Sequence, residues 1–393
     1  MAGLYIHIPF CKSRCIYCGF YSTTALELRQ RYVDAVCKEI TAHPLPLPKG
    51  EEIDTVYLGG GTPSQLSIAQ LEQILAPLIP PKGSHGDGSD DPIFEENGIT
   101  QNRPHDPEVT MECNPDDVTV AYAAALPKLG INRVSMGAQT FDDERLRFLN
   151  RRHTAAQVPQ AVQRLRDAGI TNISIDLMYG FPDETLTDWE RDIDAALALG
   201  VEHISSYCLM YEEGTPLYER LKRKDEKVTM LDEETERQMY ELLTEKLEAA
   251  GYEHYELSNW SRSHRSRHNS NYWKDVPYIG IGAASHSYDG HRRWWNVANL
   301  QEYIRRMENG ESPVEDSEPI EGWTRYNDRV TVALRTCEGL DLTTLTEEQR
   351  DYCMKNARRF MDDGLLQEKA HHLVLTRKGL FVSDMVMSEL MKV

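Results

Sequence analysis

The sequence is short of positive charge and has no long apolar run. It contains 43 lysines and arginines against 63 aspartates and glutamates, which gives a formal net charge of −20 at pH 7. A field of that sign repels a phosphate backbone, so we expect no nucleic acid among the partners. No apolar run approaches the roughly 20 residues that a membrane-spanning helix needs. The chain starts in a strand-like segment, without the basic start and apolar stretch of a signal peptide, which predicts a cytoplasmic protein.

Cysteine is also scarce, and its distribution is uneven. Three of the eight cysteines, Cys11, Cys15 and Cys18, lie within eight residues, and no second CxxC-like pair follows. This pattern is not that of a disulfide framework. Two interpretations remain open on spacing alone. Three thiolates can hold three irons of a [4Fe–4S] cluster and leave the fourth iron open to a small molecule. Alternatively, they can form a structural zinc site with a distant fourth ligand such as Cys113.

Up to about residue 210, strand-like and helix-like segments alternate about six times. The expected strands are 4–8, 53–58, 108–113, 133–136, 172–178 and 203–209. The expected helices between them are 26–40, 66–79, 118–129, 155–168 and 186–199. This alternation predicts an α/β fold with a parallel sheet, curved into a partial (β/α)6 barrel. Residues 80–107 are rich in Pro, Gly, Asp, Asn and Ser, which predicts a mobile surface insertion.

Polar side chains follow nearly every expected strand at its C-terminal end. Besides the three cysteines they are Thr62, Glu112, Gln139 and Asp176. Each of these alone could be a turn former, a cap or a salt-bridge partner. In a (β/α) barrel, however, the C-terminal ends of the strands share one rim, so we expect these residues to converge on one pocket.

The remainder of the 393 residues divides into two less regular parts. Residues 221–320 contain an expected helix at 231–250 and a strand at 252–257, followed by a polar and then an aromatic segment. Residues 321–393 suggest short helices, a hairpin near 365–375 and a closing helix at 376–390, which is typical of a winged-helix-like domain. We therefore expect three parts: a barrel core at 1–220, a barrel extension at 221–320 and a C-terminal domain at 321–393.

Several short motifs resemble the radical S-adenosylmethionine (SAM) superfamily, in particular its oxygen-independent coproporphyrinogen III oxidase-like branch. They are YIHIPFC (5–11), GGGTPS (59–64), ECNP (112–115), SMGAQ (135–139), NR (150–151), DLMYG (176–180), HNSNYW (268–273) and LTRKGLF (375–381). The resemblance covers essentially the whole chain except the insertion. It implies a radical SAM barrel with a [4Fe–4S] cluster and SAM as cofactors.

The resemblance also assigns residues to the two cofactors. It implies Cys11, Cys15 and Cys18 as cluster ligands. The implied SAM contacts are Tyr5, Tyr17, Gly60, Gly61, Thr62, Glu112, Gln139, Arg151 and Asp176. The next residue, Arg152, is also an arginine, so the arginine that the resemblance implies could be displaced by one position.

Two subfamilies of this branch differ just beyond the third cysteine. The coproporphyrinogen III dehydrogenases, which decarboxylate propionates to vinyl groups, carry a further cysteine where this chain has Phe20. They also have an extension ahead of the cluster motif. In this chain Phe20 replaces that cysteine and the first cluster cysteine is already residue 11. These two features and the HNSNYW segment resemble the HemW-type heme chaperones instead. That resemblance implies binding of heme, its delivery to an acceptor haemoprotein (a respiratory, membrane-associated one is a candidate), and an electron donor. The dehydrogenase remains the alternative function, and whether SAM is cleaved stays open.

His268, the first residue of the HNSNYW segment, is the candidate axial ligand of the heme iron. Tyr272 and Trp273 follow it and could stack on a porphyrin, and Arg265 and Arg267 could meet the propionates. The competing interpretation is a hydrogen-bonded structural histidine.

Overall fold

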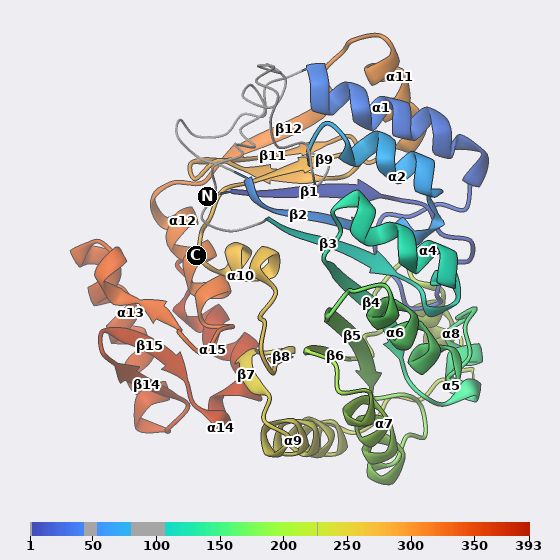
Figure 1. Ribbon diagram of the computed structural model, residues 1–393. Coiled ribbons are helices and arrows are strands. Elements are labelled where there is room, and N and C mark those ends of the chain that lie inside the picture. Colours follow the sequence, from blue (N-terminus) through green and yellow to red (C-terminus); the bar gives the residue numbers. More distant parts are fainter. Residues whose placement is uncertain (1, 43–52, 80–106, 226) are drawn as a thin grey trace.

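A computed structural model describes residues 2–42, 53–79, 107–225 and 227–393, and its centre is one large mixed sheet (Figure 1). The twelve strands follow the order β12-β11-β10-β9-β1-β2-β3-β4-β5-β6-β8-β7. A separate three-stranded sheet, β13-β15-β14, belongs to the C-terminal part. The predicted insertion at 80–107 lies outside the described residues except for its last position. Within the described ranges, no helix is long and apolar enough to cross a membrane.

Six consecutive parallel strands form the partial barrel that the sequence predicts. They are β1 (Ala2–Ile8), β2 (Ile53–Gly60), β3 (Glu108–Cys113), β4 (Arg133–Gln139), β5 (Asn172–Tyr179) and β6 (His203–Cys208). The helices of this half are α1 (Arg29–Ala42), α2 (Ile68–Leu75), α4 (Val120–Ala125), α5 (Asp143–Phe148), α6 (Gln157–Asp167), α7 (Leu186–Leu199) and α8 (Pro216–Lys222). The expected strands and helices are present, most of them with shifted ends, whereas α5 and α8 were not predicted. The predicted α/β fold with a partial barrel of six parallel strands is therefore confirmed.

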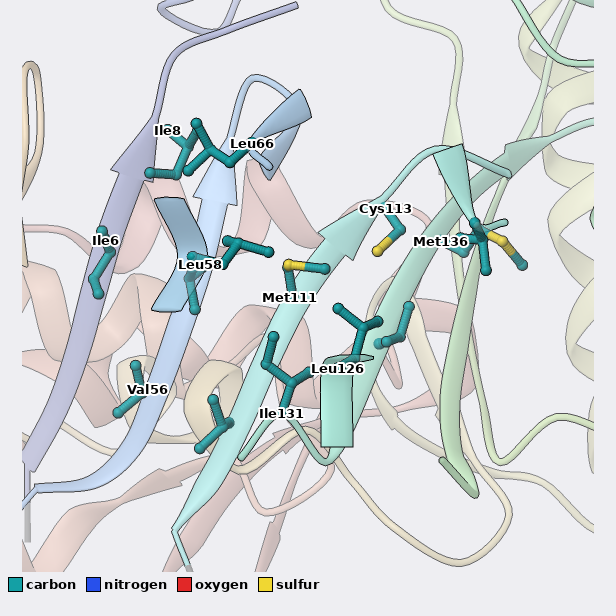
Figure 2. Close-up of a cluster of buried hydrophobic side chains, with 14 of the residues drawn as sticks. Ile6, Ile8, Val56, Leu58, Leu66, Met111, Cys113, Leu126, Ile131 and Met136 are labelled. Atoms are coloured by element: carbon teal, nitrogen blue, oxygen red, sulfur yellow. The ribbon is translucent and has the colours of Figure 1, made fainter. Parts of the chain in front are cut away.

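Alternation along the strands separates an apolar outer face from a polar interior. Figure 2 shows the outer face, where Ile6, Leu58 and Met111 from β1, β2 and β3 pack together under the helices. Their neighbours Tyr57 and Glu112 point to the other side of the sheet and bond to each other. The side chains of the outer face form the hydrophobic core together with the helices, and the polar side chains of the strands lie in the barrel interior.

Residues 221–320 extend the sheet at both ends rather than forming a separate layer. At one end, β9 (Tyr278–Ile281) pairs parallel with β1, and β10 (His286–Tyr288), β11 (Arg292–Asn296) and β12 (Val314–Pro319) continue antiparallel. At the other end, β8 (Asn259–Ser261) and β7 (Glu253–Glu256) follow β6. The helices here are α9 (Glu233–Ala249), α10 (Arg267–Trp273) and α11 (Leu300–Glu308). The HNSNYW segment is thus helical.

The C-terminal part has a hydrophobic core of its own. It consists of α12 (Gly322–Ala333), β13 (Leu340–Asp341), α13 (Glu347–Asp362), β14 (Leu366–Lys369), β15 (His372–Leu375), α14 (Arg377–Leu380) and α15 (Ser383–Leu390). The predicted hairpin is present as β14 and β15. The prediction of a single closing helix at 376–390 is wrong, because this segment forms the two helices α14 and α15. Phe381 lies between them and packs on Tyr240 of α9, with 5.5 Å between the ring centroids.

Candidate functional site

One cavity at the C-terminal rim of the barrel gathers the predicted cofactor residues. All of the predicted cluster and SAM residues except Tyr5 line it: Cys11, Cys15, Tyr17, Cys18, Gly60, Gly61, Thr62, Glu112, Gln139, Arg151 and Asp176. Tyr5 lies deeper in the barrel, where its hydroxyl is 3.0 Å from Nδ1 of His7. The rule that strand ends share one rim therefore brings these residues together as expected.

The cysteine loop is fixed to the barrel by backbone contacts. The N–H of Cys11 donates to the carbonyl of Thr23 at 2.8 Å, which ties the two ends of the loop together. Asn150 donates from its side chain to the carbonyl of Arg14 at 2.8 Å. The three thiols are consequently presented to the cavity from a loop that is held at both its base and its middle.

A glycine turn forms the adjacent wall. Gly60 has a φ of +109°, and a Cβ there would lie 2.4 Å from Cε1 of His7. A Cβ on Gly61 would lie 2.7 Å from the carbonyl carbon of Pro9. Only glycine fits either position, and the next residue, Thr62, places its hydroxyl 3.5 Å from the thiol of Cys11. The turn therefore brings bare backbone directly beside the cysteine loop.

Two half-buried carboxylates, Glu112 and Asp176, stand opposite the glycine turn. Glu112 accepts hydrogen bonds from the Tyr57 hydroxyl at 2.9 Å and from the Gly60 N–H at 3.1 Å. Burial raises the pKa of Glu112 to about 7, although both hydrogen bonds oppose the shift. Burial likewise raises the pKa of Asp176, which accepts from the Ser135 hydroxyl at 3.3 Å. Both acids are acceptors of the kind that bind hydroxyl and ammonium groups.

Gln139 and Arg151 complete the rim. Gln139 ends β4 at a register shift with a φ of +67°, a conformation that costs a non-glycine residue energy and that is concentrated at functional sites. Arg151 donates to the carbonyl of Gly137 at 2.6 Å and to the side chain of Asn114 at 2.8 Å, and its Nη1 lies 3.6 Å from the thiol of Cys15. Its Nε is buried and has no hydrogen-bond partner among the described residues.

Arg152 faces different groups from its neighbour. It forms ion pairs at 3.0 Å with Asp116 and with Asp117. Arg151 is therefore the arginine whose guanidinium lies beside the cysteines, which supports the assignment made from the sequence.

The residues of the rim fit a [4Fe–4S] cluster with SAM. The three thiols, a backbone cradle that a Cβ would fill, and a buried guanidinium nitrogen without a partner lie around one space. Cys113, the fourth ligand considered for zinc, belongs to the apolar cluster of Figure 2, and burial raises the pKa of its thiol. Cys113 borders the rim cavity as well, but only 4% of it is exposed and it packs in the apolar core, as a structural cysteine does.

His268 lies away from the rim, deep in the polar interior. It is 1% exposed, its Nδ1 is 2.7 Å from the Thr55 hydroxyl, and its Nε2 is 2.9 Å from the Tyr272 hydroxyl. Burial lowers its pKa to about 3. Glu108 of β3 accepts from the backbone N–H of His268 at 3.1 Å and so holds the start of α10. An iron could reach His268 only if one of the two side-chain contacts opened.

The two arginines expected to meet propionates are paired within the protein. Arg265 forms ion pairs with Glu253 and Glu338, and Arg267 forms one with Asp54 at 3.5 Å. A ligand carboxylate would have to compete with these carboxylates.

Sequence reasoning missed one buried cation of the interior. Arg133, the first residue of β4, is 1% exposed, and its Nε has no hydrogen-bond partner among the described residues. Its charge opposes the raised pKa values of Glu112 and Asp176. The alternation of β4 places it two residues before Ser135, on the same face, and this pattern could have identified it.

Comparisons with known proteins agree with this geometry. The family model for the radical SAM superfamily matches residues 5–196, and the model for the HemN C-terminal domain matches residues 320–382. The chain is 32% identical over 396 residues to the heme chaperone HemW of Mycobacterium tuberculosis, covering 99% of this chain and 94% of the relative. It is 31% identical to the heme chaperone HemW of Bacillus subtilis, over 88% of this chain and 87% of that one.

A solved structure shares the fold over the whole chain. It is the coproporphyrinogen III oxidase HemN of Escherichia coli, a radical SAM enzyme, with a TM-score of 0.80 and 21% identity over 100% of this chain and 90% of that one. Identity at that level supports the architecture alone. Together with the two near-complete sequence matches, the rim geometry leads to one assignment: the chain belongs to the radical SAM superfamily and, within it, to the HemW family.

Proposed function

We propose that the protein holds a [4Fe–4S] cluster and SAM at the barrel rim and serves as a heme chaperone. The observation that carries the proposal is the near-complete sequence match to proteins named heme chaperone HemW. It is supported by Phe20, which lines the mouth of the rim cavity and is 72% exposed. The coproporphyrinogen III dehydrogenases, by the resemblance described above, carry a cysteine at the position of Phe20.

At the rim, Cys11, Cys15 and Cys18 would hold the cluster. When bound with SAM, such a cluster supplies one-electron chemistry at an iron that the three cysteines leave open. The chain's own part is to bind and orient. Gly60 and Gly61 offer bare backbone to the ligand's polar end.

The remaining rim side chains would contact different charged and polar groups of SAM. Glu112 and Asp176 would accept from its hydroxyl and ammonium groups, and Arg151, whose Nε is otherwise without a partner among the described residues, would donate to its carboxylate. Gly137 leaves room for the side chains of Gln139 and Arg151 to approach the same point. A Cβ there would lie 2.6 Å from the amide nitrogen of Gln139 and 3.0 Å from the guanidinium of Arg151.

Heme is the cargo in this proposal, and it passes to an acceptor haemoprotein. Its axial ligand at His268 stays a prediction, since both ring nitrogens of His268 already have partners. The electron donor would act on the cluster, and a membrane-associated respiratory protein is a candidate acceptor.

A pair of assays on the anaerobically reconstituted full chain tests the function. We expect stoichiometric binding of hemin, and transfer of that heme to an apo-haemoprotein. We expect no protoporphyrinogen when coproporphyrinogen III, SAM and a reductant are supplied. The matched variant Phe20→Cys should still bind heme. Porphyrinogen turnover above background by the unaltered chain would contradict the chaperone function and support the dehydrogenase alternative.

A further inference from the structure

Tyr57 of β2 bonds to the rim carboxylate of Glu112 from inside the barrel. Its side chain is 9% exposed and lies outside the set of residues that line the rim cavity. Its hydroxyl donates to Oε1 of Glu112 at 2.9 Å, and the N–H of Gly60 donates to Oε2 at 3.1 Å. Both carboxylate oxygens are therefore fixed by the same strand, one through its backbone and the other through Tyr57.

The space for this contact comes from Gly59, which lies between Tyr57 and Gly60 in β2. A Cβ on Gly59 would lie 2.8 Å from Cε1 of Tyr57 and 3.0 Å from Oε1 of Glu112. The phenol ring and the carboxylate thus meet in the volume that a side chain would otherwise fill. The bare backbone of Gly59 lets Tyr57 reach across to β3.

The ring of Tyr57 packs against two other rings. Its centroid lies 6.2 Å from that of Tyr5, with 27° between the planes, and 5.1 Å from that of His268, with 26° between the planes. His268 is itself held by Thr55 and Tyr272. These contacts fix the plane of the phenol, and with it the direction of the hydroxyl. Phenylalanine at this position would keep the stacking and lose only the hydroxyl.

The hydrogen bond from Tyr57 is the strongest contact that favours the ionised form of Glu112. Burial raises the pKa of Glu112 to about 7, and the carboxylate of Asp176 on β5 adds to the shift. The hydrogen bonds from Tyr57 and Gly60 and the charge of Arg133 on β4 oppose it, and that from Tyr57 is the largest of the three. Tyr57 can only donate here, because burial raises the pKa of its own hydroxyl.

The other titratable side chains around this contact stay neutral. Burial raises the pKa of Tyr5 on β1 and of Tyr272 on α10, and the carboxylate of Glu112 adds to both shifts. Burial lowers the pKa of His268 to about 3. None of these three rings therefore changes its charge in the range where Glu112 does.

We propose that Tyr57 is a positioning residue of the SAM site, whose hydroxyl holds the carboxylate of Glu112 in the orientation and the ionised form that SAM requires. The inference rests on the proposed function, since it concerns the binding of SAM at the rim. Tyr57 acts through Glu112 and does not touch the ligand. With one lone pair of each oxygen used by Tyr57 and Gly60, the remaining lone pairs of Glu112 are left for the cavity that it lines.

The test is calorimetric titration of SAM into the cluster-reconstituted full chain and into Tyr57→Phe at pH 6, 7 and 8. Tyr57→Phe should weaken SAM binding about tenfold at pH 7. The rise of affinity with pH should also move to higher pH, because the ionised carboxylate has lost its strongest donor.

Tyr326→Phe is the matched control. Tyr326 is 1% exposed, and its hydroxyl donates to the carbonyl of Leu390 at 2.8 Å in the separate core of the C-terminal part. This variant also removes a buried hydroxyl, so it should lower the melting temperature while SAM affinity and its pH profile stay unchanged. Thermal unfolding of each variant identifies any loss caused by misfolding.

A double-mutant cycle separates positioning from a general effect on the fold. In the background Glu112→Gln, the further change Tyr57→Phe should weaken SAM binding by no more than about twofold, because the carboxylate on which Tyr57 acts is gone. A tenfold loss that persists in this background would show that Tyr57 acts independently of Glu112, and would overturn the inference.

The outcomes also separate this inference from the function on which it rests. If the unaltered reconstituted chain binds no SAM, the proposed rim site fails and the inference fails with it. If the unaltered chain binds SAM and Tyr57→Phe shows the same affinity and the same pH profile, the positioning role fails while the proposed function stands.

Discussion

If the rim binds SAM as proposed, the ionisation of Glu112 should make the affinity for SAM depend on pH. Burial raises the pKa of Glu112 to about 7, and the neighbouring carboxylate of Asp176 adds to the shift. SAM carries positive charge on its sulfonium and favours the ionised carboxylate. The raised pKa means that the free protein disfavours this form below neutrality, so affinity should rise with pH and level off above about 8.

The size of the effect follows from the pKa. With a pKa of about 7, roughly one Glu112 side chain in eleven is ionised at pH 6 and roughly ten in eleven at pH 8. If binding requires the ionised form, the affinity should increase about tenfold over this interval, or about 1.4 kcal/mol. Glu112→Gln carries no titrating group and should lose this increase.

The dependence of SAM affinity on pH can be measured by isothermal titration calorimetry of SAM into the cluster-reconstituted protein at pH 6, 7 and 8. The ligand's own amine titrates in the same range, so the quantity to compare is the difference in pH slope between the unaltered chain and Glu112→Gln. Asp176→Asn removes a negative neighbour and should shift the midpoint to lower pH. Identical slopes in the unaltered chain and Glu112→Gln would refute the reasoning.

Two further pairs of variants test the rim by matched substitutions. Arg151→Ala should weaken SAM binding about 10- to 100-fold in calorimetry and should also lower the unfolding free energy, because its guanidinium donates to Gly137 and Asn114. Arg152→Ala should lower the unfolding free energy by about 1–3 kcal/mol and leave SAM binding within about threefold. A larger loss of binding in Arg152→Ala would move the assignment by one residue. Gly169→Ala adds a Cβ with no atom within 4 Å at a φ of +92°, so denaturant unfolding should show only backbone strain of about 1–2 kcal/mol. Gly60→Ala adds a 2.4 Å clash to a similar strain and should cost clearly more, and equal losses would show that the turn can relax.

The sequence predicts the barrel well because its signals are local. The strand at 108–113 and the helix at 186–199 were placed to the residue. Buried strands of β-branched residues alternate with capped helices such as α7, where Thr185 and Asp188 form a capping box. The rim follows from topology, because parallel strands put their C-terminal ends on one side.

What the sequence could not supply are contacts between distant segments. Strands β9 to β12 are short, and each depends on a partner strand rather than on its own pattern, so none of the four was predicted. The burial of His268 has the same origin, since its partner Thr55 is more than two hundred residues away. Residue type suggests that a histidine can bind a metal, but only tertiary structure shows whether its nitrogens are free.

The position of β1 in the sheet has a consequence for the order of assembly. The strand that carries the cysteine loop lies between β2 and β9, and its partner residues in β9 are Tyr278–Ile281. During synthesis β1 can pair with β2 early, but its other edge stays open until most of the chain has left the ribosome. Until then, the loop and its three thiols belong to an edge strand. We therefore expect the proposed cluster to be held stably only after β9 has joined the sheet, so that chains truncated before β9 retain the cysteines yet fail to hold iron and sulfide.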